Sequence, residues 1–202
     1  MSPEPPAAAP SVVRVAVYGG SFDPPHVAHQ AAVRLVASLE EIDRVLVLPV
    51  FEHAFDKSLA SFEHRVAMCE LCMSNQPNVE VSQLEATLQR PNFTLNTLQA
   101  LLREHPEFRL RLVVGADVLQ DAAKWHRFPE VVRLAPLLPL GRVGVPSNAA
   151  PAPVLPDVSS TEIRSVLAGR AAARLSPALR ARLSQLLDPR VIEYIEAHDL
   201  YR

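Results

Sequence analysis

Between residues 12 and 50 the chain alternates apolar runs with one amphipathic segment, and this alternation limits the folds open to it. The run VVRVAVY at 12–18 is rich in β-branched side chains and predicts a strand. The segment GGSFDPPH follows, and its two glycines and two prolines predict a loop. From 27 to 41, apolar side chains recur at steps of three and four, which predicts a helix. With a second strand predicted at 44–50, this stretch is a βαβ unit with parallel strands.

The same alternation continues along the chain. The apolar patterns predict helices at 62–75 and 95–104, with Thr94 as the N-cap of the second, and mostly helix at 160–198. They predict strands at 79–81, 109–117 and 137–140, and a long loop at 144–156, where four prolines fall. We therefore predict an α/β fold with a Rossmann-like, doubly wound parallel sheet and a small helical C-terminal region at 160–202. Residues 12–202 are expected to form a single domain, and residues 1–11 a disordered Pro- and Ala-rich tail.

Composition and charge remove several classes of function. The 202 residues carry 20 Lys and Arg against 22 Asp and Glu, a net charge of −2, whereas proteins that bind nucleic acid are usually strongly basic. No apolar run reaches the roughly 18 residues of a membrane-spanning helix. The first residues lack the basic start and apolar stretch of a signal peptide. We expect a cytoplasmic protein that binds neither nucleic acid nor membrane; the sequence leaves its oligomeric state open.

The two cysteines, Cys69 and Cys72, form a lone Cys-x-x-Cys within a helical pattern. A zinc site needs further ligands at comparable spacing, and a thioredoxin-like pair would stand at the start of a helix. The pair instead falls in the middle of the predicted helix, so we interpret both residues as buried structural thiols.

Three polar loops follow predicted strands, and ligands of parallel sheets bind beyond the carboxyl ends of the strands. In the first loop, Gly19 and Gly20 let backbone amides approach a ligand, and the helix that starts near His26 adds its own N–H groups. His26 and His29 are three residues apart and share one side of that helix. The alternative is a tight turn with two surface histidines. The conjunction of these features favours a polyphosphate site.

The motifs of the chain resemble those of a known family. GGSFDPPHVAH is similar to the GGTFDPxHxGH signature of the nicotinate (or nicotinamide) mononucleotide adenylyltransferases, in the nucleotidyltransferase superfamily with the HxGH motif. The resemblance continues in the family's order through Lys57 before an RxxM helix, RPNFTLNTL, VVGADVLQDAAKW, Arg142 in GRVG, VSSTEIR and YIEAHDLYR. The chain departs from the family at Ala28 (glycine in the motif), Asn92 (serine), Phe93 (tyrosine) and the segment EHAFDK.

This resemblance implies an enzyme of NAD biosynthesis that transfers the adenylyl group of ATP to a pyridine mononucleotide and releases pyrophosphate. The mononucleotide phosphate would attack the α-phosphorus, so catalysis would consist of positioning and charge neutralisation. Mg²⁺ would accompany ATP without a dedicated protein cage. The resemblance assigns catalysis to His26, His29, Lys57 and Arg164. It assigns ATP binding to Gly19, Gly20, Ser21, Phe22, His26, His29, Gly115, Asp117, Arg142, Ser160, Thr161 and Arg164.

The pyridine mononucleotide would meet Lys57, Phe93, Thr94 and Trp125, with the Trp125 ring stacked on the pyridine. The basic neighbours of Trp125 predict a loop or exposed turn there. The resemblance, above all through GADVL…W and the NFT segment, implies nicotinate mononucleotide as acceptor and deamido-NAD as product, and N–H groups around Phe93 and Thr94 suit its carboxylate. Ser160 and Thr161 could also serve only as a helix cap, Asp117 as another, and Lys57 as a solvated loop residue.

Three other functions stay open. The acceptor could be nicotinamide mononucleotide. The chain could be another adenylyltransferase of the superfamily, such as pantetheine-phosphate adenylyltransferase. It could also be a nucleotide-binding homologue without activity, an interpretation suggested by Ala28 and opposed by both histidines and Arg164.

Overall fold

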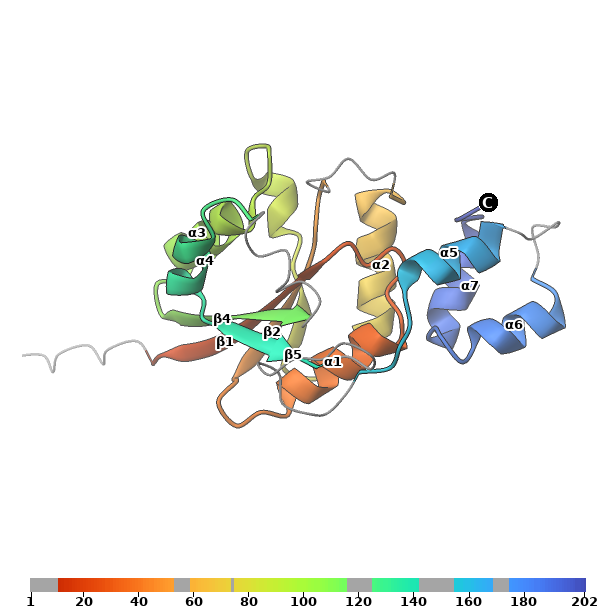
Figure 1. Cartoon of the computed structure of the whole chain (residues 1–202), viewed down its shortest axis with the longest axis horizontal. Coiled ribbons are helices and arrows are strands. Elements are labelled where there is room, and N and C mark those ends of the chain that lie inside the picture. Colours follow the sequence, from red (N-terminus) through yellow and green to blue (C-terminus); the bar gives the residue numbers. More distant parts are fainter. Residues whose placement is uncertain (1–10, 53–58, 74, 116–124, 142–154, 169–174) are drawn as a thin grey trace, which may run out of the picture.

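A five-stranded parallel sheet forms the centre of the molecule (Figure 1). The structure, a computed structural model, describes residues 11–52, 59–73, 75–115, 125–141, 155–168 and 175–202. The order of the strands is β3-β2-β1-β4-β5, and every neighbouring pair is parallel. The strands are β1 (Val13–Gly20), β2 (Arg44–Pro49), β3 (Val79–Val81), β4 (Phe108–Gly115) and β5 (Leu137–Leu140). The predicted Rossmann-like α/β class is confirmed.

Helices cover both faces of the sheet. The helices between the strands are α1 (Val27–Ala37), α2 (Phe62–Met73), α3 (Thr94–Glu104) and α4 (Phe128–Leu134), with a short 3-10 helix, η1 (Leu84–Thr87). Three more follow the last strand: α5 (Ser160–Ala168), α6 (Pro177–Leu183) and α7 (Pro189–Ala197). Figure 1 shows these three grouped on the side toward which β4 and β5 point.

The alternation of side chains along the strands divides the core into two layers. On β1, Ala16 joins a buried cluster with side chains of α1, α2, α5, α6 and α7. Its neighbours Val15 and Val17 point the other way and join a second cluster with α3 and α4. On β2, Val45 and Val47 belong to the first cluster. The parallel sheet is therefore buried on both faces, as its nearly continuous apolar strands require.

The direction of winding reverses between β1 and β4. From β1 the chain proceeds outward through β2 and β3, and then returns to place β4 on the other side of β1. The loops that leave these two neighbouring strands lead to α1 on one face and toward α3 and α4 on the other. Such a reversal opens a crevice at the carboxyl ends of the strands, where nucleotides bind in doubly wound folds.

Several predicted boundaries need correction. β1 runs through the glycine pair to Gly20, because Gly19 and Gly20 still pair with β2. The first helix ends at Ala37, four residues before the predicted end, and the Ser38 hydroxyl donates to the Leu35 carbonyl there. Thr94 is the first residue of α3 and Phe93 is its N-cap. Both η1 and α4 were missing from the prediction.

The cysteine interpretation is confirmed. Cys69 and Cys72 are free and buried in α2. Burial raises the pKa of the Cys72 thiol to about 12 and that of the Cys69 thiol well above its ordinary value, so neither is a ready thiolate.

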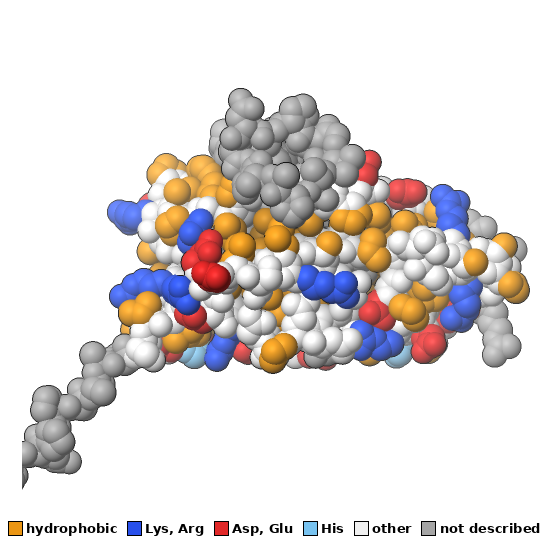
Figure 2. Space-filling view, turned by 90° about the horizontal axis from the view of Figure 1, so that it is seen from below, with side chains coloured by type: hydrophobic (Ala, Val, Ile, Leu, Met, Phe, Trp, Pro, Cys, Tyr) orange, Lys and Arg blue, Asp and Glu red, His pale blue; other side chains and the backbone are white. Residues whose placement is uncertain are grey.

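The surface carries mixed charges. Figure 2 shows basic and acidic side chains interspersed over the face in view, in keeping with the net charge of −2. Among the described residues, no helix has the length and apolar character to cross a membrane.

Candidate active site

A cavity of about 980 Å³ lies at the carboxyl ends of β1 and β4. All the predicted site residues that the structure describes line it, from five separate stretches of chain. They are Gly19, Gly20, Ser21, Phe22, His26, His29, Phe93, Thr94, Gly115, Trp125, Ser160, Thr161 and Arg164. The predicted Lys57, Asp117 and Arg142 lie outside the described residues.

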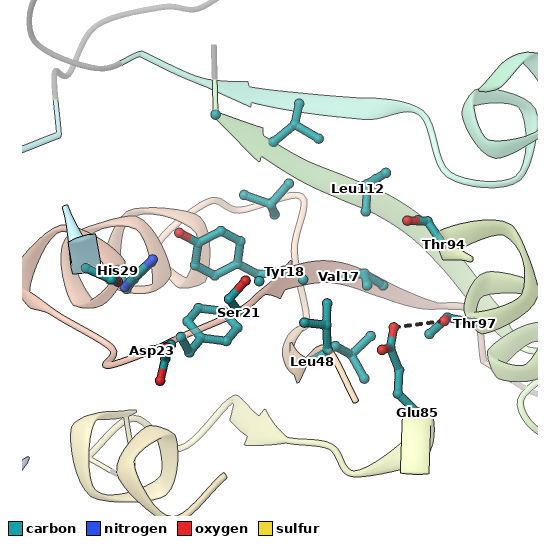
Figure 3. A pocket seen from close by; sticks show the side chains of 18 of the residues that line it. Val17, Tyr18, Ser21, Asp23, His29, Leu48, Glu85, Thr94, Thr97 and Leu112 are labelled. Atoms are coloured by element: carbon teal, nitrogen blue, oxygen red, sulfur yellow. Dashed lines mark hydrogen bonds between the residues drawn. The ribbon is translucent and has the colours of Figure 1, made fainter. Parts of the chain in front are cut away.

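The cavity has two polar ends joined by an apolar floor. Figure 3 shows Tyr18, Ser21, Asp23 and His29 at one end, and Thr94, Thr97 and Glu85 at the other. Side chains of the strands, Val17, Leu48 and Leu112, lie between them. An elongated cavity with two polar ends suits two substrates that meet in the middle.

The glycine loop is shaped by Phe22. Its backbone adopts a positive φ of 47°, and its ring is buried beneath the loop. A Cβ placed on Gly20 would lie 3.0 Å from that ring, closer than normal packing allows. A larger residue at position 20 would therefore require the Phe22 ring to shift, and with glycine the backbone stays bare along the wall of the cavity.

The two histidines stand together at the N-terminus of α1. His26 is the N-cap, and its backbone N–H donates to Nδ1 of His29 over 3.2 Å. The two rings stack with their centroids 3.7 Å apart. Because Nδ1 of His29 accepts this hydrogen bond, the neutral ring carries its proton on Nε2, which is then a donor. The first turn of α1 holds no acidic residue, so the helix dipole favours an anion here, while the Val27 N–H donates to the Leu186 carbonyl and the Gln30 N–H to the His26 carbonyl.

Arg65 fixes the loops around the end of the cavity that holds His26 and His29, a role that the sequence did not assign. Its side chain is only 1% exposed and donates to the carbonyls of Ser21 (2.9 Å), Ala60 (2.9 Å) and Phe51 (3.3 Å). Burial lowers the pKa of Arg65 from its ordinary value, but an arginine remains charged at neutral pH. One guanidinium thus ties the ends of the loops after β1 and β2 together.

The N-terminus of α5 also lies at the cavity, together with those of α1 and α3. The cap is Ser159, whose hydroxyl accepts the N–H of Glu162. Ser160, for which a cap role was the simpler alternative, donates instead to the Pro24 carbonyl over 2.9 Å. Arg164 donates from Nη1 to the carbonyl of Asp23 (2.6 Å). These contacts attach α5 to the loop that carries the two histidines.

Aromatic rings and the start of α3 form the opposite end. The Phe93 carbonyl accepts the N–H groups of Asn96 and Thr97, and these hydrogen bonds form the first turn of α3. That turn holds no acidic residue. The ring of His126, a residue that sequence reasoning missed, stacks on Phe93 at 4.4 Å between centroids. Trp125 lies in a turn, as predicted, but is half-buried and packs against the α3–α4 cluster.

Glu85 is the second functional candidate that sequence reasoning missed. It lies in η1, is 7% exposed and lines the cavity. Its carboxylate accepts the Thr97 hydroxyl (3.0 Å) and the Phe51 N–H (3.0 Å), and burial raises its pKa. In the sequence this is one glutamate among many, because only the packing of η1 against α3 reveals its burial.

The described residues bring together no group of three or more His, Cys, Asp or Glu side chains able to hold a metal ion.

A doubly wound fold with a glycine loop, paired histidines and three helix N-termini around one crevice defines a nucleotide-binding enzyme of the nucleotidyltransferase class. A family model described as Cytidylyltransferase-like matches residues 17–166. The chain is 41% identical, over 93% of its length and 96% of the relative's, to a probable nicotinate-nucleotide adenylyltransferase of Anaeromyxobacter dehalogenans strain 2CP-C. The chain belongs to the cytidylyltransferase-like family and, within it, to the group of the nicotinate-nucleotide adenylyltransferases.

Further relatives agree. A probable nicotinate-nucleotide adenylyltransferase of Myxococcus xanthus strain DK1622 is 37% identical over 94% of this chain and 95% of its own. The fold is similar to that of Plasmodium falciparum nicotinic acid mononucleotide adenylyltransferase complexed with NaAD, with a TM-score of 0.77. That match is 21% identical and covers 94% of this chain and 97% of the other.

Proposed function

We propose that this protein transfers the adenylyl group of ATP to nicotinate mononucleotide, giving deamido-NAD and pyrophosphate. The observation that carries the proposal is the two-ended cavity at the reversal of the sheet, with phosphate-binding groups at one end and aromatic groups at the other. The relatives described as nicotinate-nucleotide adenylyltransferases support the same reaction.

The reaction needs no protein nucleophile. A phosphate oxygen of the mononucleotide forms a bond to the α-phosphorus of ATP, and the bond from that phosphorus to the bridging oxygen of the β-phosphate breaks. Pyrophosphate leaves with the electron pair. Negative charge builds on the phosphoryl oxygens, so the site must supply donors that are already in place.

In this proposal, His26, His29 and the first turn of α1 stabilise that charge. Ser160, Thr161 and Arg164 bind the β- and γ-phosphates, while Gly19 to Phe22 line the nucleotide. Mg²⁺ enters with ATP and neutralises phosphate charge. Lys57, Asp117 and Arg142 keep their predicted roles toward the mononucleotide phosphate, the ribose and ATP. A cytoplasmic location also stays a prediction.

The pyridine ring is proposed to bind against Trp125, with its carboxylate at the start of α3. The N–H groups of the first turn around Thr94 are donors, which suit a carboxylate. The amide of nicotinamide would turn its own NH₂ donors toward those groups and leave polar atoms unpaired. His126, stacked on Phe93, adds a further aromatic ring beside this end.

The test is release of pyrophosphate from ATP with a panel of acceptors: nicotinate mononucleotide, nicotinamide mononucleotide and pantetheine phosphate. CTP replaces ATP in a parallel series, because the family model is broader than adenylyl transfer. We expect the highest kcat/KM with ATP and nicotinate mononucleotide. An equal or higher value for the amide form would overturn the acceptor preference alone. ATP binding without turnover on any acceptor would favour a non-catalytic nucleotide-binding role.

A further inference from the structure

Tyr201 contacts Asp23 in the loop between β1 and α1, although the two residues are 178 positions apart in the sequence. Its hydroxyl donates to Oδ1 of Asp23 over 2.7 Å. Asp23 directly follows Phe22 in the loop, lines the cavity and is only 1% exposed. Tyr201 itself does not line the cavity described above, so any effect on substrates must pass through Asp23.

Asp23 in turn holds Arg164. The Asp23 carbonyl accepts a hydrogen bond from Nη1 of Arg164 over 2.6 Å, and the same nitrogen lies 3.6 Å from Oδ2 of the carboxylate. The other end of the guanidinium donates to the Thr161 hydroxyl over 3.3 Å. Arg164 lines the cavity and its side chain is 31% exposed, so the guanidinium is held on one side and open on the other.

The two oxygens of the Asp23 carboxylate face different partners. Oδ1 accepts the Tyr201 hydroxyl and the Ala60 N–H (3.2 Å), whereas Oδ2 lies toward Arg164. These two donors fix the rotation of the carboxylate. A tyrosine hydroxyl also offsets part of the buried negative charge without adding a second cation that would compete for phosphate. Burial and the adjacent carboxylate raise the pKa of Tyr201, so the hydroxyl stays a donor at neutral pH.

We propose that Tyr201 is a positioning residue for nucleotide binding, which acts through Asp23 to orient the Arg164 guanidinium toward the phosphates of ATP. The inference rests on the proposed function in one respect, namely that Arg164 binds those phosphates. It does not depend on which acceptor the enzyme uses.

The hydroxyl and the ring of Tyr201 can be separated experimentally. The ring packs against the cluster of α1, α2 and the C-terminal helices, and a phenylalanine would keep that packing. Tyr201→Phe therefore removes the hydrogen bond to Asp23 alone. Tyr194→Phe is the matched control, because the Tyr194 hydroxyl bonds to Nδ1 of His64 over 3.0 Å between α2 and α7, outside the lining of the cavity.

The experiment measures the Kd of ATP by calorimetry without any acceptor, together with kcat, the KM of each substrate and the melting temperature. For Tyr201→Phe we expect ATP affinity to fall on the order of tenfold, the scale of one hydrogen bond to a charged group. The KM of the mononucleotide should change much less. Tyr194→Phe should bind ATP like the parent protein. Unchanged ATP affinity in Tyr201→Phe, with the fold intact, would overturn the inference.

A double-mutant cycle tests the route through Arg164. Arg164→Lys keeps the charge but loses the planar fork that Asp23 holds. If Tyr201 acts through Arg164, adding Tyr201→Phe to Arg164→Lys costs little further ATP affinity. The same tenfold loss in both backgrounds would show that Tyr201 acts by another route and would also overturn the inference. Loss of ATP affinity in Tyr201→Phe, in a protein that turns over no tested acceptor, would support the inference and refute the proposed function.

Discussion

At the scale of single residues, contacts within the site fix the orientation of individual side chains and the shape of the loop after β1. The hydrogen bond from the His26 N–H fixes the tautomer of His29, and the ring of Phe22 leaves little room for a side chain at position 20. Ala28 in place of the motif's glycine fits the helix, where it is buried and lines the cavity. At this scale the resemblance to a family named the residues, and only the structure supplied their partners.

The first prediction concerns the paired histidines. His29→Ala and His26→Ala should each lower kcat roughly a hundredfold or more, because a preorganised donor to transition-state charge contributes on the order of 3 kcal/mol. The measurement is pyrophosphate release, alongside thermal unfolding. His105→Ala is the control, since His105 lies beyond the C-terminus of α3, outside the cavity lining. Near-normal turnover in both active-site variants would refute the phosphate role.

At the scale of the elements, local pattern predicted what local pattern determines. The strand at 79–81 and the strand at 137–140 have the predicted bounds, and α2 and α3 lie within a residue or two of theirs. Tertiary packing decided the rest. Gly19 and Gly20 stay in β1 because β2 offers them pairing partners, and α4 is too short to show a helical period.

The site also combines features that the local sequence determines with features that only the fold creates. The glycine loop and its helix are contiguous in the sequence, so their chemistry could be predicted from the residues alone. Glu85 and His126 could not be found in this way, because their importance comes from contacts with Thr97 and Phe93 on a different element. Arg65 stood in a recognisable motif, yet its three carbonyl partners lie on two loops whose proximity only the fold creates.

The second prediction belongs to η1 and concerns pH. Burial raises the pKa of Glu85 above its ordinary value of 4.5. Between pH 4.5 and this raised pKa, the folded protein therefore holds a proton on Glu85 that the unfolded chain has released. The contribution of Glu85 to stability is therefore complete below pH 4.5 and declines as the pH rises through the raised folded-state pKa. Glu85→Gln should remove this decline. Its amide can still accept the Phe51 N–H while donating to Thr97.

Urea unfolding from pH 4 to pH 7 measures the effect as the free energy of unfolding of the parent protein and of Glu85→Gln. The two curves should diverge with rising pH, in favour of the variant. Glu80→Gln on β3 is the control, because the Glu80 side chain is 58% exposed and its curve should run parallel to that of the parent. Parallel curves for Glu85→Gln as well would contradict the prediction.

At the scale of the whole molecule, the C-terminal helices share one core with the sheet. Ile192 and Ile195 of α7 lie in the same buried cluster as Ala32 of α1 and Met68 of α2. The side chains of Arg164 and Tyr201 add polar contacts to Asp23 in the loop after β1. A helical region so joined should not unfold by itself.

The third prediction is therefore a single cooperative unfolding transition for residues 12–202. Trp125, the only tryptophan of the chain, packs on the α3–α4 face, whereas α5, α6 and α7 belong to the other face. Tryptophan fluorescence thus reports on the α3–α4 face, whereas helical circular dichroism reports on all the helices, including α5, α6 and α7. Their thermal midpoints should coincide and should rise together when ATP is added. Separate midpoints would indicate that residues 160–202 form an independent unit.

The contacts of Asp23 also bear on how the enzyme is made. The loop after β1 is synthesised before the Arg164 and Tyr201 side chains that bond to Asp23, which follow Asp23 by 141 and 178 residues. A nascent chain can form the βαβ unit early, because its strands and helix are neighbours in the sequence. The loop after β1 nevertheless lacks these partners until the chain has been made through Tyr201. A growing polypeptide that has not reached this residue therefore has an incomplete set of contacts around Asp23.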